Sequence, residues 1–94
     1  MKLGIKIQQY KTRSGGLTNN FIIKTDNGTF LQSYQSIIAF IPNDSFNNKV
    51  ILDINTWNYS RNTSCFRSNM LKESSGETKK RIKKGNYILD NLNE

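Results

Sequence analysis

The sequence predicts a small α+β domain in which an antiparallel meander of four to five strands is followed by one or two short C-terminal helices. Three observations lead to this class. Short apolar stretches of strand length, separated by polar turns, fill the first 54 residues. An Asn-Gly pair lies between two β-favouring runs. Beyond Trp57 the β-branched residues become scarce, and serines and threonines stand where a helix would begin.

The first strand is predicted within residues 2–11. Leu3, Ile5 and Ile7 alternate there with polar or small neighbours, which is the period of a half-buried strand. Residues 12–20 hold a Gly-Gly pair among polar turn formers. We expect a mobile surface loop over that stretch.

The next two strands are predicted as a hairpin of residues 21–25 and 29–33. Asn27-Gly28 lies between them, and this dipeptide is typical of tight hairpin turns. We expect a type I′ turn, in which both central residues have positive φ.

Two more strands are predicted over residues 37–41 and 50–54. The first is a continuous apolar run that Pro42 ends, and it is too short for a helix. Such a run indicates a strand that is buried on both faces or lies at an interface. A polar loop at residues 43–48 separates the two strands.

A short amphipathic helix is predicted over residues 62–73. Phe66 and Met70 are four residues apart, and Leu71 extends the same side. Ser60 precedes the stretch and is suited to cap its first turn.

A second helix is predicted over residues 76–84, with Ser75 as its cap and Gly85 at the left-handed position that ends it. Residues 86–90 suit either a last strand or a continuation of this helix.

At 94 residues the chain is predicted to be a single small domain, 1–94. The sheet is placed at about 2–54 and a helical basic region at about 61–84. The tail at 91–94 is expected to fray.

The cysteine and histidine contents exclude several kinds of site. Cys65 is the single cysteine, so no intramolecular disulfide forms, and we expect it to be a small buried side chain. The chain has no histidine, and its seven carboxylates show no spacing typical of metal binding or of a catalytic pair. We therefore expect no cofactor, no metal and no enzymatic activity. Without a signal peptide or an apolar run of 18 residues, the chain is expected to be cytoplasmic in a host cell and not bound to a membrane.

The net charge of +7 is concentrated in one segment. Residues 61–84 hold eight basic and two acidic residues, a balance of +6, whereas residues 1–60 carry +3 and residues 85–94 carry −2. Such a patch attracts phosphate backbones through counterion release. A solvated helix face that keeps a small protein soluble is the competing interpretation. The candidate residues for binding nucleic acid or a partner are Arg61, Arg67, Lys72, Lys79, Lys80, Arg81, Lys83 and Lys84.

Three aromatic residues near this segment are candidates for base stacking: Tyr34, Trp57 and Tyr59. In a chain with so few aliphatic residues, aromatic rings are also needed in the core. We favour a core position for Trp57.

Two stretches carry a resemblance to a known family: Ser33-Tyr34-Gln35-Ser36-Ile37-Ile38-Ala39 and Trp57-Asn58-Tyr59-Ser60-Arg61-Asn62-Thr63. The chain resembles a family of small uncharacterised phage and mobile-element proteins, a domain of unknown function. In that family a Ser-Tyr-x-Ser/Thr segment leads into an apolar strand, and Trp-x-Tyr-Ser leads into a helix with a basic tail. A basic residue and His commonly follow in the family where Ser64-Cys65 stand here, so that histidine's role does not carry over. The resemblance implies a mobile-element setting and no mechanism.

Three functional hypotheses follow. The leading one is a non-catalytic phage or mobile-element accessory or inhibitor protein that engages nucleic acid or a host ribonucleoprotein through its basic C-terminal surface. Counter-defence of the anti-CRISPR kind is one form of it. The second is a protein-interaction or structural module, including a homo-oligomer, that uses residues 37–41 or a sheet edge while its charge only aids solubility. The third is a small nuclease-like enzyme without histidine.

Overall fold

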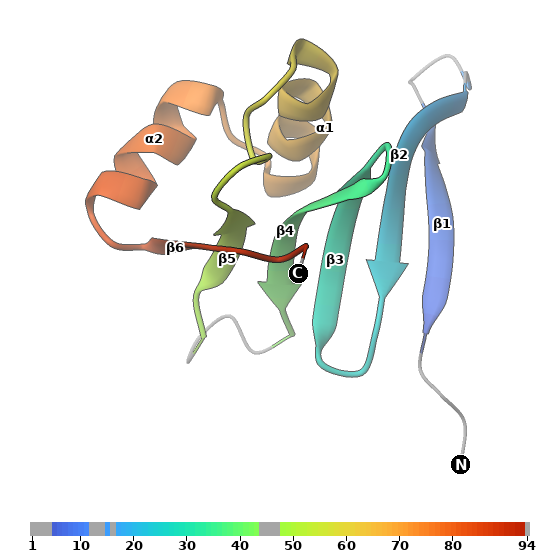
Figure 1. Ribbon diagram of the computed structural model, residues 1–94, viewed down its shortest axis with the longest axis horizontal. Helices are drawn as coiled ribbons and strands as arrows, with labels where there is room; N and C mark the ends of the chain where they lie inside the picture. The colour runs from blue at the N-terminus through green and yellow to red at the C-terminus, as the bar shows by residue number, and fades with distance from the viewer. Residues whose placement is uncertain (1–4, 12–14, 16, 44–47, 94) are drawn as a thin grey trace.

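Within the described residues, six strands form one sheet in chain order, and two helices lie between the fifth and sixth strands (Figure 1). The computed structural model describes residues 5–11, 15, 17–43 and 48–93. The elements are β1 (Lys6–Lys11), β2 (Leu17–Lys24), β3 (Gly28–Ser33), β4 (Ser36–Pro42), β5 (Val50–Asp53), α1 (Arg61–Leu71), α2 (Ser75–Lys83) and β6 (Tyr87–Asp90). The predicted α+β class is confirmed, with slightly more strands than the four to five expected.

The additional strand is β6, which pairs with β5 in the parallel direction, whereas all other neighbours are antiparallel. A parallel pair needs a crossover connection, and α1 and α2 together supply it. Residues 86–90 therefore take the strand alternative, and the meander closes on a strand that follows the helices.

The core lies between the sheet and α1. Ile22, Leu31, Ala39 and Leu52 are successive partners across β2, β3, β4 and β5 and form one buried row. The ring of Phe66 in α1 packs against this row. The predicted helix over 62–73 is thus confirmed as α1, and Met70 and Leu71 pack on the core as expected. We call the side of the sheet that carries this row the helix face.

The hairpin of β2 and β3 is confirmed, but its predicted turn type is wrong. No positive φ occurs at Asn27 or Gly28. Instead, the Thr25 hydroxyl accepts hydrogen bonds from the backbone N–H groups of both residues, at 3.3 and 3.2 Å. Gly28 is needed for close approach, because a Cβ there would lie 2.5 Å from the carbonyl oxygen of Ile41 and 2.6 Å from the ring of Phe40.

The turn between β3 and β4 carries the strained backbone instead. Tyr34 has φ 56°, a left-handed conformation that a residue with a side chain rarely adopts. Its backbone N–H donates to the carbonyl of Asn19 at 2.6 Å. This bond ties the turn to the neighbouring strand β2.

The expected loop at 12–20 ends earlier than predicted, because β2 begins at Leu17; residues 12–14 and 16 lie outside the described residues. The Thr18 hydroxyl donates to the carbonyl of Tyr10 at 2.6 Å, and the Gln9 side-chain amide donates to the carbonyl of Thr18. These bonds continue the ladder between β1 and β2 past the bulge at Gln9 and Lys11.

The predicted half-burial of the first strand is wrong. Ile5 and Ile7 are 54% and 68% exposed, because they lie on the side of the sheet away from the helices, while Leu3 lies outside the described part of the chain. Within β4, Ile38 and Ala39 are fully buried, whereas Ile37, Phe40 and Ile41 are half-buried, so the structure does not show the expected burial on both faces.

The helix ends follow local rules. Ser60 caps α1 as predicted, accepting from the N–H of Thr63 at 3.1 Å, and Gly85 has φ 78° at the end of the second helix. The cap of α2 is Ser74 and not Ser75, because Glu77 three residues later completes a capping box with Ser74.

Hydrogen bonds join the described residues of the tail to the sheet. The backbone N–H of Leu92 donates to Asp53 at 2.8 Å. The side-chain amide of Asn93 donates to the carbonyl of Ile37 and accepts from its N–H. This segment continues along the sheet where β5 has ended; Glu94 lies outside the described residues.

Candidate functional site

Four lysines dominate the outer surface of α2 and its C-cap: Lys79, Lys80, Lys83 and Lys84. At 100° per residue they cover an arc of about 140°, opposite Thr78, which is buried, and Ile82, which packs toward the core. All four are exposed, and within the described residues none of their ammonium groups forms a hydrogen bond or an ion pair. Their charges are therefore available to a partner. We call these four residues the lysine face.

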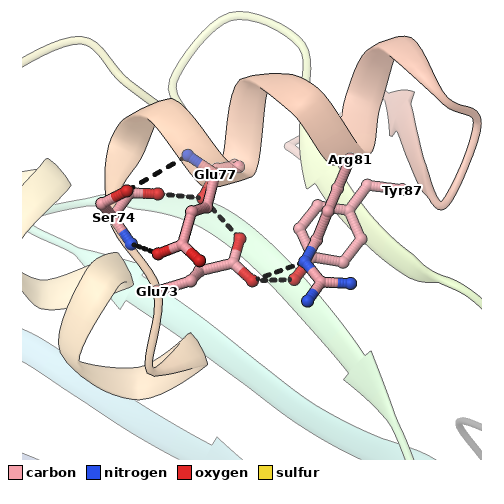
Figure 2. A network of polar contacts seen from close by, with 6 residues as sticks. Glu73, Ser74, Glu77, Arg81 and Tyr87 are labelled. Atoms are coloured by element: carbon pink, nitrogen blue, oxygen red, sulfur yellow. Dashed lines mark hydrogen bonds and ion pairs between the residues drawn. The ribbon is translucent and has the colours of Figure 1, made fainter.

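Arg81 belongs to the same helix but has a structural role (Figure 2). Its Nε atom lies 3.0 Å from the Oε1 atom of Glu73, and its guanidinium lies 5.8 Å from the centre of the Tyr87 ring. The side chain remains 48% exposed. Arg81 thus joins α2 to β6 and leaves only part of its charge toward solvent.

Glu73 is the centre of this network. Its side chain is only 5% exposed and accepts hydrogen bonds from the hydroxyls of Tyr87, at 2.7 Å, and Thr78, at 2.6 Å. Burial, followed by the hydrogen bond to this carboxylate, raises the pKa of Tyr87 to about 12. Near Glu73, hydrogen bonds from the backbone and the side chain of Ser74 lower the pKa of Glu77. The network fixes the orientation of α2 on the sheet and so the direction in which the lysine face points.

Arg67 is not part of the basic surface, because its residue is fully buried. Its guanidinium donates to the carbonyl of Trp57 at 2.6 Å, to Oδ1 of Asn58 at 3.2 Å and to the hydroxyl of Ser75 at 2.7 Å. Burial lowers the pKa of Arg67, against the opposing charge of Glu73. Arg67 was expected to bind nucleic acid or a partner, but its buried side chain makes structural contacts instead.

The other two candidates lie apart from each other. Arg61 is the first residue of α1 and Lys72 is its C-cap, so about 16 Å of helix separates them; both are exposed.

A cation that sequence reasoning missed is Lys49, whose ammonium donates to the carbonyl of Gly85 at 2.6 Å, next to the end of α2. Only the tertiary fold brings it there, since 36 residues separate the two.

The aromatic candidates divide between core and surface. Trp57 is half-buried and packs against the core, as favoured, whereas Tyr34 and Tyr59 are exposed. The hydroxyl of Tyr34 accepts from the side chain of Asn62 at 3.1 Å. Within the described residues, none of these rings is stacked beside the lysine face.

The two motifs behind the family resemblance meet in a buried polar network. The hydroxyls of Ser33 and Thr63 lie 2.8 Å apart, and Ser33 also donates to Oδ1 of Asn20. The amide of Asn20 donates in turn to Oδ1 of Asn62 at 3.0 Å. Because these groups satisfy each other, the motifs have a structural explanation.

A cavity of about 460 Å³ opens between β1, β2 and α1, and Tyr10, Asn62, Cys65 and Asn69 contribute to its lining. Cys65 is exposed in this cavity, so the expectation of a buried cysteine is wrong. Among residues 5–11, 15, 17–43 and 48–93 no cluster of three or more His, Cys, Asp or Glu side chains is suited to hold a metal ion. Neither described helix has the length and apolar character needed to cross a bilayer.

Comparisons with known proteins found no relative of this chain. No family model, no curated protein and no solved structure matches the chain. The resemblance to the phage and mobile-element family stays a prediction.

Proposed function

We propose that this chain is a non-catalytic accessory protein that binds nucleic acid, free or within a ribonucleoprotein, through the lysine face of α2. The observation that supports it is the separation of the basic residues by role. Arg67 and Arg81 make internal contacts, whereas the exposed ammonium groups of Lys79, Lys80 and Lys83 form no hydrogen bond or ion pair within the described part of the chain.

The chemistry of lysine favours a phosphate backbone over a specific base. An ammonium group is a compact point charge on a flexible stem, without the planar fork that arginine uses in paired contacts to bases. A row of such charges binds phosphates by releasing counterions, and it needs no sequence. The proposal therefore predicts binding with little sequence preference and a strong dependence on salt.

Helix stabilisation explains only part of this charge. Lys80 and Lys83 lie in the last turn, where cations stabilise the helix dipole by about 0.3–1 kcal/mol each. Lys79 lies in the middle of the helix, and Lys49 brings a further cation to its end. The charge exceeds what the helix end alone requires.

The biological setting that we propose is a phage or mobile element, with counter-defence of the anti-CRISPR kind as one form. It is supported by the Ser-Tyr-x-Ser and Trp-x-Tyr-Ser motifs and by the small size of the chain. An inhibitor of a ribonucleoprotein would use the lysine face to compete for phosphates that the host complex also contacts.

The test is affinity purification of the tagged protein from its native host, with and without nuclease treatment. Three proteins are compared: the natural chain, a site variant (Lys79→Gln, Lys80→Gln, Lys83→Gln) and a control variant (Lys6→Gln, Lys11→Gln, Lys24→Gln). The control removes the same number of charges from exposed positions of β1 and β2.

We expect the natural chain and the control variant to retain nucleic acid and the site variant to lose it. Nuclease treatment should release the partners of the natural chain. Partners that persist after nuclease treatment and remain bound to the site variant would overturn the proposal. Far-UV circular dichroism establishes that α2 is intact in each variant.

A further inference from the structure

A small cavity lies along α2 and shares two lysines with the lysine face. Its volume is about 270 Å³, and its lining consists of Glu77, Lys80, Arg81, Lys84 and Asn86. The first four of these residues follow one another at i, i+3, i+4 and i+7, so they form one stripe of α2 and its C-cap. A cavity below the roughly 300–1,000 Å³ of small-molecule sites is suited to a single chemical group. We call it the cationic pocket.

The cations of this pocket have donors to offer. The ammonium groups of Lys80 and Lys84 are exposed and form no hydrogen bond or ion pair within the described residues. Arg81 contacts Glu73 through its Nε atom, and Figure 2 marks no contact at its two terminal nitrogens. The side chain of Asn86 is exposed and, in the described part of the chain, donates no hydrogen bond. Three cations and one amide can therefore donate to the same ligand.

Arg81 gives the cationic pocket a fixed donor. Its Nε atom is held 3.0 Å from Glu73, whose side chain is only 5% exposed, and its guanidinium lies over the Tyr87 ring. A guanidinium that is already oriented loses little side-chain entropy when it binds. Its planar fork also matches the geometry of a phosphate group, which a lysine alone does not.

The end of α2 is built so that it repels an anion less than most helix ends do. The last carbonyls of a helix carry partial negative charge when they have no partner. Here the N–H of Asn86 donates to the carbonyl of Arg81 at 2.8 Å, and the N–H of Gly85 donates to the carbonyl of Ile82 at 3.1 Å, which together form a Schellman motif. The carbonyl of Gly85 accepts from the ammonium of Lys49 at 2.6 Å. These carbonyls are thus occupied, and Lys49 adds a cation.

Glu77 stands at the opposite end of the cationic pocket. Its carboxylate accepts from the N–H of Ser74 at 2.9 Å, at the start of α2. About 10 Å of helix separates Glu77 from Lys84. The pocket therefore runs from a carboxylate to a cationic end, and an anionic group belongs at the end near Lys84 and Asn86.

The donors of the pocket match the terminal phosphate of a strand better than a phosphate within the strand. A terminal phosphate is a monoester with three free oxygens and about −1.5 to −2 charges at pH 7. A backbone phosphate has two free oxygens, one charge and a sugar on either side. Each cation can meet one oxygen of the terminal group, which has no second sugar to keep it out of a concave site. Binding also relieves the repulsion between Lys80 and Lys84, which are like charges four residues apart on the helix.

We infer that the cationic pocket binds the terminal phosphate of a nucleic-acid strand, while Lys79 and Lys83 beside it bind the backbone phosphates that follow. The inference rests on the proposed nucleic-acid binding and gives the lysine face a preferred position on the strand, its phosphorylated end. It also gives Arg81 a binding role in addition to its contact with Glu73.

Fluorescence anisotropy at constant salt tests the inference with short single strands of RNA and of DNA. One sequence is prepared with a 5′-phosphate, with a 3′-phosphate and with hydroxyls at both ends. A hydroxyl-ended strand that is two nucleotides longer has about the same total charge as a phosphorylated strand. This longer strand separates recognition of the end from a general effect of added charge.

The variants remove equal charge from inside and outside the pocket. The pocket variant is Lys80→Gln with Lys84→Gln. The matched variant, Lys79→Gln with Lys83→Gln, has the same spacing on the same helix but lies outside the pocket lining. Arg81→Lys keeps a cation beside Glu73 and removes the two terminal nitrogens. Far-UV circular dichroism checks that α2 is intact in each variant.

We expect the natural chain to bind at least one phosphorylated strand about fivefold or more tightly than the longer hydroxyl-ended strand, because the terminal phosphate makes charge-assisted hydrogen bonds that a longer backbone does not add. The matched variant should bind every strand more weakly and keep this ratio. The pocket variant and Arg81→Lys should bring the ratio close to one.

The other outcomes contradict the inference in distinguishable ways. If the natural chain binds the phosphorylated strands and the longer hydroxyl-ended strand equally, the inference is wrong and the proposed nucleic-acid binding stands. A ratio that the pocket variant keeps has the same meaning. If the natural chain binds none of the strands, the proposed function is wrong and the inference falls with it.

Discussion

The guanidinium of Arg67 lies 5.0 Å from the centre of the Trp57 ring and donates at 2.6 Å to the carbonyl of the same residue. A further bond to Ser75 joins this corner to the first turn of α2. One buried arginine thus connects the segment before α1, the helix itself and the start of the next helix. Its Nε is the buried side-chain polar atom that has no partner within the described residues.

Replacing Arg67 with Ala should destabilise the fold strongly. The change leaves the carbonyl of Trp57 and the hydroxyl of Ser75 without their donors and removes a packed side chain, which together cost about 2–4 kcal/mol. Arg67→Lys keeps the charge but loses the planar contact and should cost about half as much. Urea unfolding at pH 7 measures both, and a loss below about 0.5 kcal/mol for Arg67→Ala would contradict this role.

Thr63→Val should destabilise the domain through the polar network between the two motifs. The variant keeps the shape of the side chain but removes the hydroxyl that contacts Ser33 at 2.8 Å and Ser60 at 3.0 Å, which costs about 1–3 kcal/mol. Thr63→Ser keeps the hydroxyl and serves as the control, with a smaller loss. If thermal unfolding showed valine to be tolerated better than serine, packing and not the hydroxyl would be the function of this position.

Asp53 should make stability depend on pH at the acid end. Burial alone would raise the pKa of this carboxyl, but hydrogen bonds from the N–H of Leu92, the hydroxyl of Thr56 and other donors outweigh it, so the pKa lies below its ordinary value. The carboxylate therefore stabilises the fold above the unfolded pKa of about 3.9, and this contribution is lost as the pH falls through the folded pKa.

The measurement is the free energy of unfolding from pH 2 to pH 7 for the natural chain and for Asp53→Asn. We expect the variant to be less stable by about 1–3 kcal/mol at pH 7, and the difference to shrink below about pH 4. A difference that stayed constant over this range would show that the charge of Asp53 has no part in holding Leu92.

Local signals predicted much of the fold. The hairpin of β2 and β3, the helix around Phe66, the Ser60 cap and the Gly85 stop each depend on a few adjacent residues, and each is confirmed. The true cap of α2 had a signal as well, since Glu77 lies three residues after Ser74.

What the sequence did not predict depends on tertiary contacts. Alternation in β1 shows which residues share a face with Ile7, but it does not show which face of the sheet the helices cover. In the structure the helices cover the opposite face, and Ile7 is exposed. Within the basic segment, sequence does not distinguish Arg67, whose partners come from Trp57 and Ser75, from the exposed Lys79. Lys49 reaches the end of α2 only because β5 lies beside β6.

The salt dependence of nucleic-acid binding tests the central claim most directly. Binding of labelled duplex DNA and of single-stranded RNA is measured by fluorescence anisotropy at several salt concentrations, for the natural chain, the site variant and the control variant. Both variants have a net charge of +4, so only the position of the lost charge differs.

If the lysine face binds phosphates, the site variant lowers the slope of log K against log salt by about 2.7 on duplex DNA and by about 2.1 on single strands, while the control variant keeps a slope close to that of the natural chain. Equal slopes for the site and control variants would contradict the account.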